Sequence, residues 1–187
     1  MGRKALALVT LAFAAGLLAG LNAPRGLADQ IMELAKELVQ RVYTEDPFEL
    51  ALRILLNNAR VVALLAVLSP LVVAPALVVF ANGFILGVAL EFAAGRASWW
   101  AAIAAVAPHG VLEIPALLYA AAACTSFGVA LWRKILGRRG TPWRKLLALL
   151  LKPLAISLLL LAAAAIIEAF VTPALLKLIV GARPLPA

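Results

Sequence analysis

The chain contains several runs of apolar residues long enough to cross a lipid bilayer, and this feature limits its fold more than any other. Apolar residues make up 65% of the 187 residues and charged residues only 14%. A bilayer core of about 30 Å needs about 20 helical residues to span it. The strands of a membrane β-barrel would alternate apolar and polar residues, and these runs do not. The sequence therefore predicts an all-α, polytopic membrane protein.

The charged residues follow the pattern of a membrane protein rather than that of a nucleic-acid-binding protein. The net charge is +8, and the basic residues cluster at the ends of the apolar runs, as the positive-inside rule expects. Residues 133–145 carry six basic residues and no acidic one, so we expect this loop to be cytoplasmic. No basic face with interleaved aromatic residues is present. We therefore expect a lipid bilayer as the environment and exclude nucleic acid as a partner.

The apolar runs predict five membrane spans in a single membrane domain that covers residues 1–187. The expected segments are a first span at 5–21, a second at 61–80, a short third at 82–95, a half-helix plus a fourth span within 98–132, and a fifth at 146–171. Counting spans from the basic loop places the N-terminus in the cytoplasm and the C-terminus outside. The chain is thus predicted to be a multi-pass protein of the cell membrane.

The region between the first two spans is the most polar part of the chain. Residues 22–60 hold six of the nine acidic residues. Apolar residues recur at helical spacing from Ile31 to Val42, which predicts an amphipathic helix, and Asp46 followed by Pro47 predicts the start of a second helix. We expect an extramembrane helical hairpin at 28–58. The sequence leaves open whether this hairpin caps the helix ends or docks a partner.

The most unusual segment is Pro108-His109-Gly110-Val111-Leu112-Glu113-Ile114-Pro115. It holds the only histidine and one of the three acidic residues that follow Asn57. Its prolines and glycine predict a break at 108–110, between a half-helix at 99–107 and a full span at 111–132, and thus one broken or re-entrant element. Ionisable side chains inside a membrane are usually paired, water-facing or functional. This segment is therefore the first place to look for a site.

Two roles follow directly from the spacing of His109 and Glu113, which share a helix face if the chain is helical from Gly110. As a structural lock, Glu113 would pair with His109 or accept hydrogen bonds from backbone N–H groups freed by the break. The lock would then hold the segment against Asn82 or Arg60. As a permeation or substrate site, the pair would relay protons or bind a cation or a small polar molecule.

The other two acids of the apolar region, Glu91 and Glu168, are further candidates for the same wet cavity. An intramembrane hydrolase is the least favoured role. One histidine cannot supply a His-Glu-x-x-His zinc site, and no Gly-x-Ser-x-Gly element is present. We therefore expect no catalytic residue, no metal and no cofactor.

Three polar motifs occur in a fixed order along the chain. They are Asn57-Asn58-Ala59-Arg60, Asn82-Gly83-Phe84-Ile85-Leu86-Gly87 and Pro108-His109-Gly110-Val111-Leu112-Glu113-Ile114-Pro115-Ala116. In this order they resemble the stage II sporulation protein M family of integral membrane proteins, over roughly residues 48–132. The chain departs from the family pattern at Ser69, Pro70 and Pro75, where glycines are usual.

The resemblance implies a multispanning helical protein without an established catalytic activity. The family's namesake works with cell-wall-degrading partners in the membrane during engulfment in endospore formers. Family members also occur in bacteria and archaea that form no spores, so the sporulation role does not follow from the resemblance alone.

Together these features predict a non-enzymatic scaffold or accessory subunit that organises membrane or envelope partners, including those of a transport system. The alternative is a small transporter or channel that uses His109 and Glu113 at the broken helix. We also expect a homo-oligomer, because spans rich in small residues and the outer hairpin leave surface for self-association. Gly16 and Gly20 have the spacing that lets helices approach closely, but filler residues in an Ala/Leu/Gly-rich run would look the same.

Overall fold

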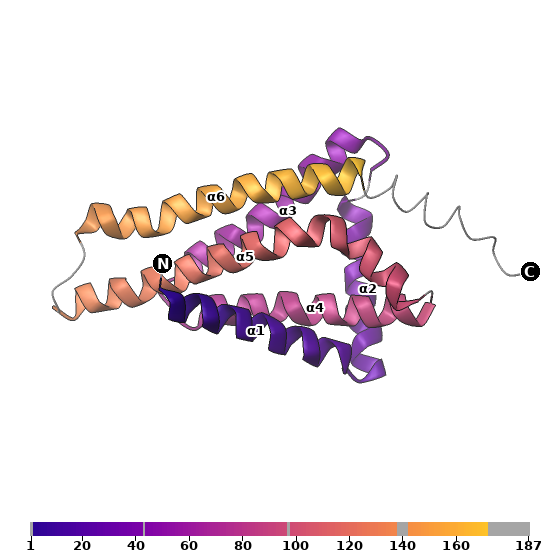
Figure 1. Ribbon diagram of the computed structural model, residues 1–187, viewed down its shortest axis with the longest axis horizontal. Helices are drawn as coiled ribbons and strands as arrows, with labels where there is room; N and C mark the ends of the chain where they lie inside the picture. Colours follow the sequence, from indigo (N-terminus) through magenta and orange to yellow (C-terminus); the bar gives the residue numbers. More distant parts are fainter. Residues whose placement is uncertain (1, 43, 97, 138–141, 172–187) are drawn as a thin grey trace, which may run out of the picture.

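The computed structural model describes residues 2–42, 44–96, 98–137 and 142–171, which form six α-helices (Figure 1). The helices are α1 (Arg3–Leu21), α2 (Arg25–Val42), α3 (Pro47–Leu68), α4 (Ala74–Arg96), α5 (Trp99–Ile135) and α6 (Trp143–Phe170). Five of them are long and apolar enough to cross a membrane: α1, α3, α4, the part of α5 from Gly110 onward, and α6. The predicted all-α, polytopic fold with five spans is therefore confirmed.

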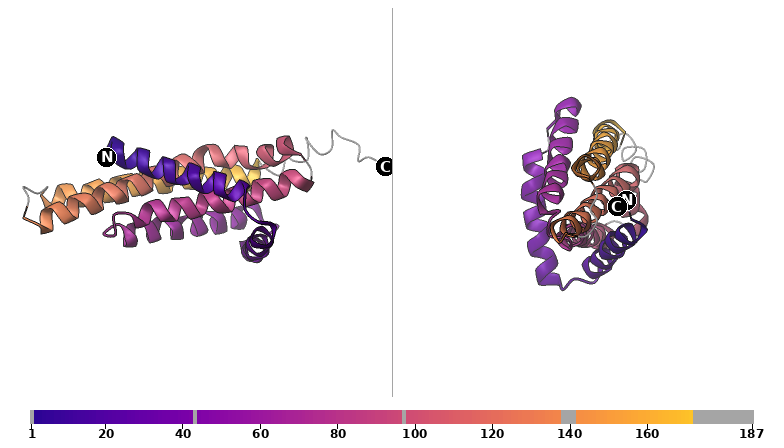
Figure 2. Two further views of the ribbon diagram at one scale, coloured as in Figure 1. Left: turned by 90° about the horizontal axis from the view of Figure 1, so that it is seen from below. Right: turned by 90° about the vertical axis from the view of Figure 1, so that its left-hand side faces the viewer.

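Helix α2 runs across the spans, whereas the five spanning helices lie alongside one another (Figures 1 and 2). Its apolar residues Ile31, Leu34 and Ala35 face Phe80 and Phe84 of α4 across an apolar cavity of about 480 Å³. An amphipathic helix that lies across a bundle, with charged residues on its other face, has the form of a helix in the membrane interface. The expected amphipathic helix after the first span is thus present.

The second helix of the expected hairpin is continuous with the next candidate span. Helix α3 begins as the sequence predicts, with Pro47 in its first turn and the Asp46 side chain accepting a hydrogen bond of 2.9 Å from the backbone N–H of Phe48. It then continues without interruption to Leu68. The two helices of the expected hairpin are therefore α2 and the first part of α3, and the extramembrane placement of 28–58 stays a prediction.

The boundaries of the next two spans also differ from the expected 61–80 and 82–95. Helix α3 ends at Leu68 and α4 begins at Ala74, so Pro70 lies in the turn between them. Pro75 occupies the first turn of α4, where the missing N–H of proline costs no helical hydrogen bond. The two prolines thus flank a turn rather than kink a span. As a result α4 is a full-length span of 23 residues, and Asn82 lies inside it.

Helix α5 has continuous helical backbone over 37 residues, and the predicted interruption at 108–110 is absent. In its place the helix changes direction within its N-terminal part (Figure 1). Pro108 and Pro115 each remove one backbone donor from the helix, and proline is a common cause of such a bend. The re-entrant half-helix of the prediction is therefore the first part of one long, bent helix.

Helices α1 and α4 are in backbone contact through four glycines. A Cβ atom on any of these glycines would overlap the main chain of the other helix. The pairs are Gly16 with the carbonyl of Phe80, Gly20 with that of Phe84, Gly83 with that of Phe13, and Gly87 with that of Leu17. The Gly-x-x-x-Gly spacing of α1 thus belongs to a helix interface, and α4 contributes the same spacing from its side.

The order of these pairs shows that α1 and α4 are parallel, since positions farther along α1 meet positions farther along α4. Two parallel spans must be separated by an odd number of other spans, and α3 is the one between them. The structure therefore agrees with the prediction that the first and third spans cross the membrane in the same direction.

The remaining spans form the other half of the bundle. Residues Ala120 to Cys124 of α5 and Ala164 and Ala165 of α6 are buried, and α6 also packs along α3. At one end the rings of Phe48 on α3 and Phe170 on α6 meet edge to face, with centroids 5.1 Å apart. Small residues let α5 and α6 approach closely, and the aromatic pair ties the start of α3 to the end of α6.

We expect Gly87→Val to destabilise the protein markedly and Gly95→Val to have little effect. The added side chain at Gly87 would meet the backbone of α1, which no rotamer change can relieve, whereas nothing lies within 4 Å of a Cβ at Gly95. Overpacking of this kind costs about 1–3 kcal/mol or more. Thermal unfolding in detergent, followed by the loss of monodisperse protein, measures the difference. Equal midpoints for the two variants would contradict the close contact.

Candidate functional site

The structure brings three of the predicted site residues, Asn82, Gly110 and Glu113, into the lining of one cavity. Asn82 comes from α4 and Glu113 from α5, and the cavity of about 240 Å³ lies between these helices and α1. Every other lining residue is apolar or glycine. One Asn82 Nδ2 hydrogen is donated to the carbonyl of Val78 at 2.9 Å, which leaves the amide oxygen available to other donors.

A second, larger cavity adjoins the first. Its volume is about 440 Å³, and its lining from α1, α4 and α5 contains no ionisable residue. The two cavities share Phe13, Leu86, Gly110 and Ile114 as a common wall. Gly110 adds no side chain to this wall.

Several other predicted site residues lie elsewhere. Glu91 is exposed on α4 and Glu168 is half-buried near the end of α6, and neither lines the cavity of Glu113. Gly83 belongs to the α1–α4 contact. The expected single cavity shared by the three acids is therefore not formed.

None of the three polar residues of the first motif lines this cavity. Asn58 is half-buried and Arg60 exposed on α3, outside the lining of both cavities. The predicted hold of the segment against Arg60 stays a prediction. The side chains of Pro108 and His109 lie outside the described residues, so the pairing of His109 with Glu113 stays a prediction.

The exposed face of α3 is a polar surface that the sequence analysis missed. Glu49, Arg53, Asn57 and Arg60 follow one another at intervals of three or four residues and so form one stripe along the helix. Asn57 and Arg60 are exposed, and the side chains of Arg53 and Glu49 are 39% and 46% exposed. The opposite face of α3 holds the buried Val62. We call these four residues the polar stripe of α3.

Part of the polar stripe lies deep in the span. Arg60 comes 13 residues after Pro47 and 8 before Leu68, which corresponds to about 20 Å and about 12 Å along the helix axis. Arg53 Nη2 pairs with Glu49 Oε1 at 2.6 Å. A signal for this arrangement was present in the sequence, because Leu50, Ile54 and Leu55 continue at helical spacing into the apolar run that follows.

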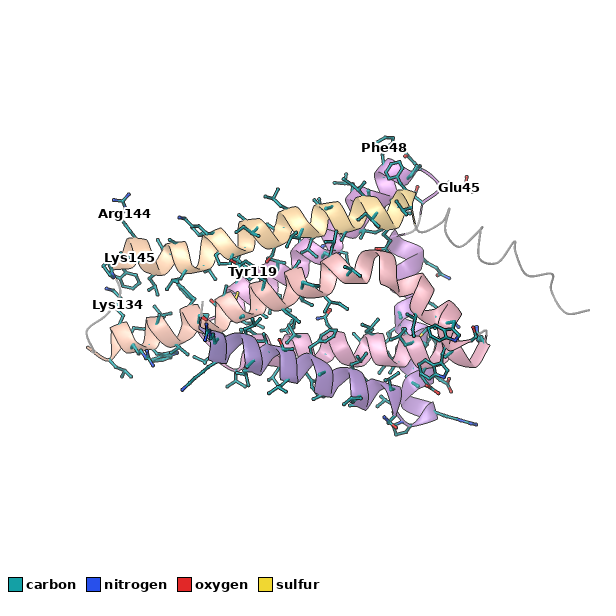
Figure 3. The ribbon with its side chains drawn as sticks, in the orientation of Figure 1. Glu45, Phe48, Tyr119, Lys134, Arg144 and Lys145 are labelled. Atoms are coloured by element: carbon teal, nitrogen blue, oxygen red, sulfur yellow. The ribbon has the colours of Figure 1, made fainter. Side chains whose placement is uncertain are left out.

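A group of basic residues lies at the opposite end of the bundle from Glu45 and Phe48 (Figure 3). Lys134, Arg144 and Lys145 lie at the paired ends of α5 and α6, which extend beyond the turn between α3 and α4 (Figure 2). The indole N–H of Trp132 donates to the carbonyl of Pro70 at 2.8 Å and ties α5 to that turn. The cytoplasmic placement of this end stays a prediction.

Of the comparisons with known proteins, the one with protein families gives a match. A family model described as Stage II sporulation protein M matches residues 5–173, a range that reaches into all five candidate spans. No curated protein and no solved structure matches the chain.

Proposed function

Because the chain belongs to the stage II sporulation protein M family, we propose that it is a non-enzymatic scaffold or accessory subunit that binds membrane-spanning parts of envelope or transport partners. Its five candidate spans make it a multi-pass membrane protein. The family match covers nearly the whole chain, so the proposal concerns the entire bundle rather than one segment.

The observation that carries this proposal is the polar stripe of α3. An arginine that faces lipid near the middle of a bilayer costs about 2.5–3.5 kcal/mol on insertion scales. Helix α3 packs on α6 and α5 with its other face, and within the described part of the chain no helix covers Asn57 or Arg60. A protein partner that covers the stripe removes this cost, whereas lipid does not. The stripe thus favours a protein that works in a membrane complex.

The position of Ser126 relative to His109 supports the non-enzymatic part of the proposal, because a serine hydrolase would need the two side chains close together. Ser126 lies 17 residues after His109 on the same helix, a separation of about 25 Å along the helix axis. Its hydroxyl donates to the carbonyl of Ala122 at 2.7 Å, an ordinary contact for a serine within a helix. The cavity with a polar lining holds one carboxylate, Glu113, and therefore no acid dyad.

Photo-crosslinking in native membranes tests the scaffold role. A benzophenone attached to Leu56→Cys, in a Cys124→Ala background, reports what lies beside the polar stripe without altering it, because Leu56 is 49% exposed. Leu159→Cys on α6, 72% exposed, is the matched control for a face expected to meet lipid. We expect protein adducts from the label at 56 and mainly lipid adducts from the label at 159. Equal lipid labelling at both positions would refute the proposal.

A small transporter or channel is the second candidate, and the cavity lined by Asn82 and Glu113 is the observation that favours it. Under the scaffold proposal, Glu113→Gln lowers the thermal unfolding midpoint, and wild-type proteoliposomes show no proton flux by an internal pH-sensitive dye. Glu91→Gln, at an exposed position on α4, serves as the control for loss of a charge. Proton flux in the wild type that disappears in Glu113→Gln with unchanged stability would favour the transporter instead.

A further inference from the structure

We propose that the partner of the polar stripe is a membrane-spanning helix of another protein that carries an aspartate or glutamate at the depth of Arg60. This inference rests on the proposed scaffold function and names the chemistry of its partner. Three observations support it. The first is which charges of the stripe are already paired, the second is the depth of Arg60 along α3, and the third is the position of the acidic residues in a second copy of the chain.

Arg60 is the charge that the stripe leaves for a partner. Arg53 is paired with Glu49 at 2.6 Å on the same helix. The positions one turn before and after Arg60 hold Leu56, Asn57, Ala63 and Leu64, so its own helix offers no carboxylate within one turn. Among the described residues no ion pair of Arg60 occurs. The unpaired guanidinium is therefore the strongest recognition group on this face.

The depth of Arg60 selects the chemistry of the partner. Both ends of α3 are more than 10 Å away along the helix axis, so the guanidinium has lipid or a neighbouring helix beside it rather than bulk water. A carboxylate at the same depth would satisfy the fork of N–H donors with two parallel hydrogen bonds, which neutral side chains cannot do. Asn57, one turn away, offers an amide for an additional hydrogen bond across the helix contact.

A second copy of the chain does not supply such a carboxylate at this depth. Two copies in one membrane share their orientation, so facing stripes would bring Arg60 against Arg60. The exposed acid of α4, Glu91, lies 17 residues from Ala74, about 25 Å beyond the α3–α4 turn. Arg60 lies only about 12 Å from the same turn. Glu113 lines the cavity between α1, α4 and α5. The partner is therefore a different protein.

Binding of designed spanning peptides to the purified full chain in liposomes tests this inference. The host peptide is a Leu/Ala helix with lysines at both ends, and its central residue is Glu, Gln or Leu. Energy transfer between a labelled chain and a labelled peptide at pH 8 measures the affinity. We expect the Glu peptide to bind about ten-fold more tightly than the Leu peptide, with the Gln peptide between them.

Two variants show whether the preference for the Glu peptide depends on Arg60. Arg60→Leu should abolish most of the preference for the Glu peptide, because it removes the only guanidinium at that depth of α3. Lys152→Leu, which removes an exposed cation from α6, should retain the preference. Both side chains are exposed, so neither substitution disturbs the core, and the peptide comparison on the wild-type chain stands without them.

The outcomes separate this inference from the scaffold proposal. Equal binding of the Glu and Leu peptides overturns the carboxylate partner, and protein adducts at position 56 would leave the scaffold role intact. Self-association of the chain that Arg60→Leu abolishes also overturns it, in favour of a second copy. A preference for the Glu peptide that survives Arg60→Leu places recognition elsewhere and overturns it as well.

Discussion

The backbone contact between α1 and α4 is the constraint on which the other helices depend. Glycines on both helices bring the two main chains together along the second half of α1, and only a parallel arrangement gives this match. The chain must therefore return across the membrane between them, which is the task of α3, and α2 must bridge the distance from α1 to the start of α3. The transverse course of α2 is a direct result (Figure 1).

The same contact accounts for the open space around Glu113. Helices α1 and α4 pack tightly as a pair, and α5 packs against α6 with the side that faces away from this pair. The bent first part of α5 leaves gaps against the paired helices that its small and apolar residues do not fill. Asn82 and Glu113 are the polar groups in that space, and they come from the two elements that the bend separates.

The fold class followed from the sequence because the length of an apolar run is a local property. The start of α3 was also readable, since Asp46 and Pro47 form a local capping signal. Depth in the membrane is not local. Asn57 and Arg60 were placed outside the bilayer because polar residues in a helix look alike at the surface and within a span. Pro70 and Pro75 were placed inside a span for a similar reason, because only the packing of α3 and α4 shows that they flank a turn. Of the candidate site, the sequence singled out Asn82 and Glu113, but their common cavity depends on the bend of α5.

The glycines of α1 and those of α4 lie far apart in the sequence, which has a consequence for the synthesis of the protein. Helix α1 leaves the ribosome first, and α2 and α3 are synthesised before its glycine face has α4 to contact. At roughly 5–20 residues per second, that interval lasts several seconds. During it α1 has no α4 to contact, and α3, with arginines on one face, is made before the bundle exists. The order of the helices therefore delays the closest contact of the fold until its third candidate span has been synthesised.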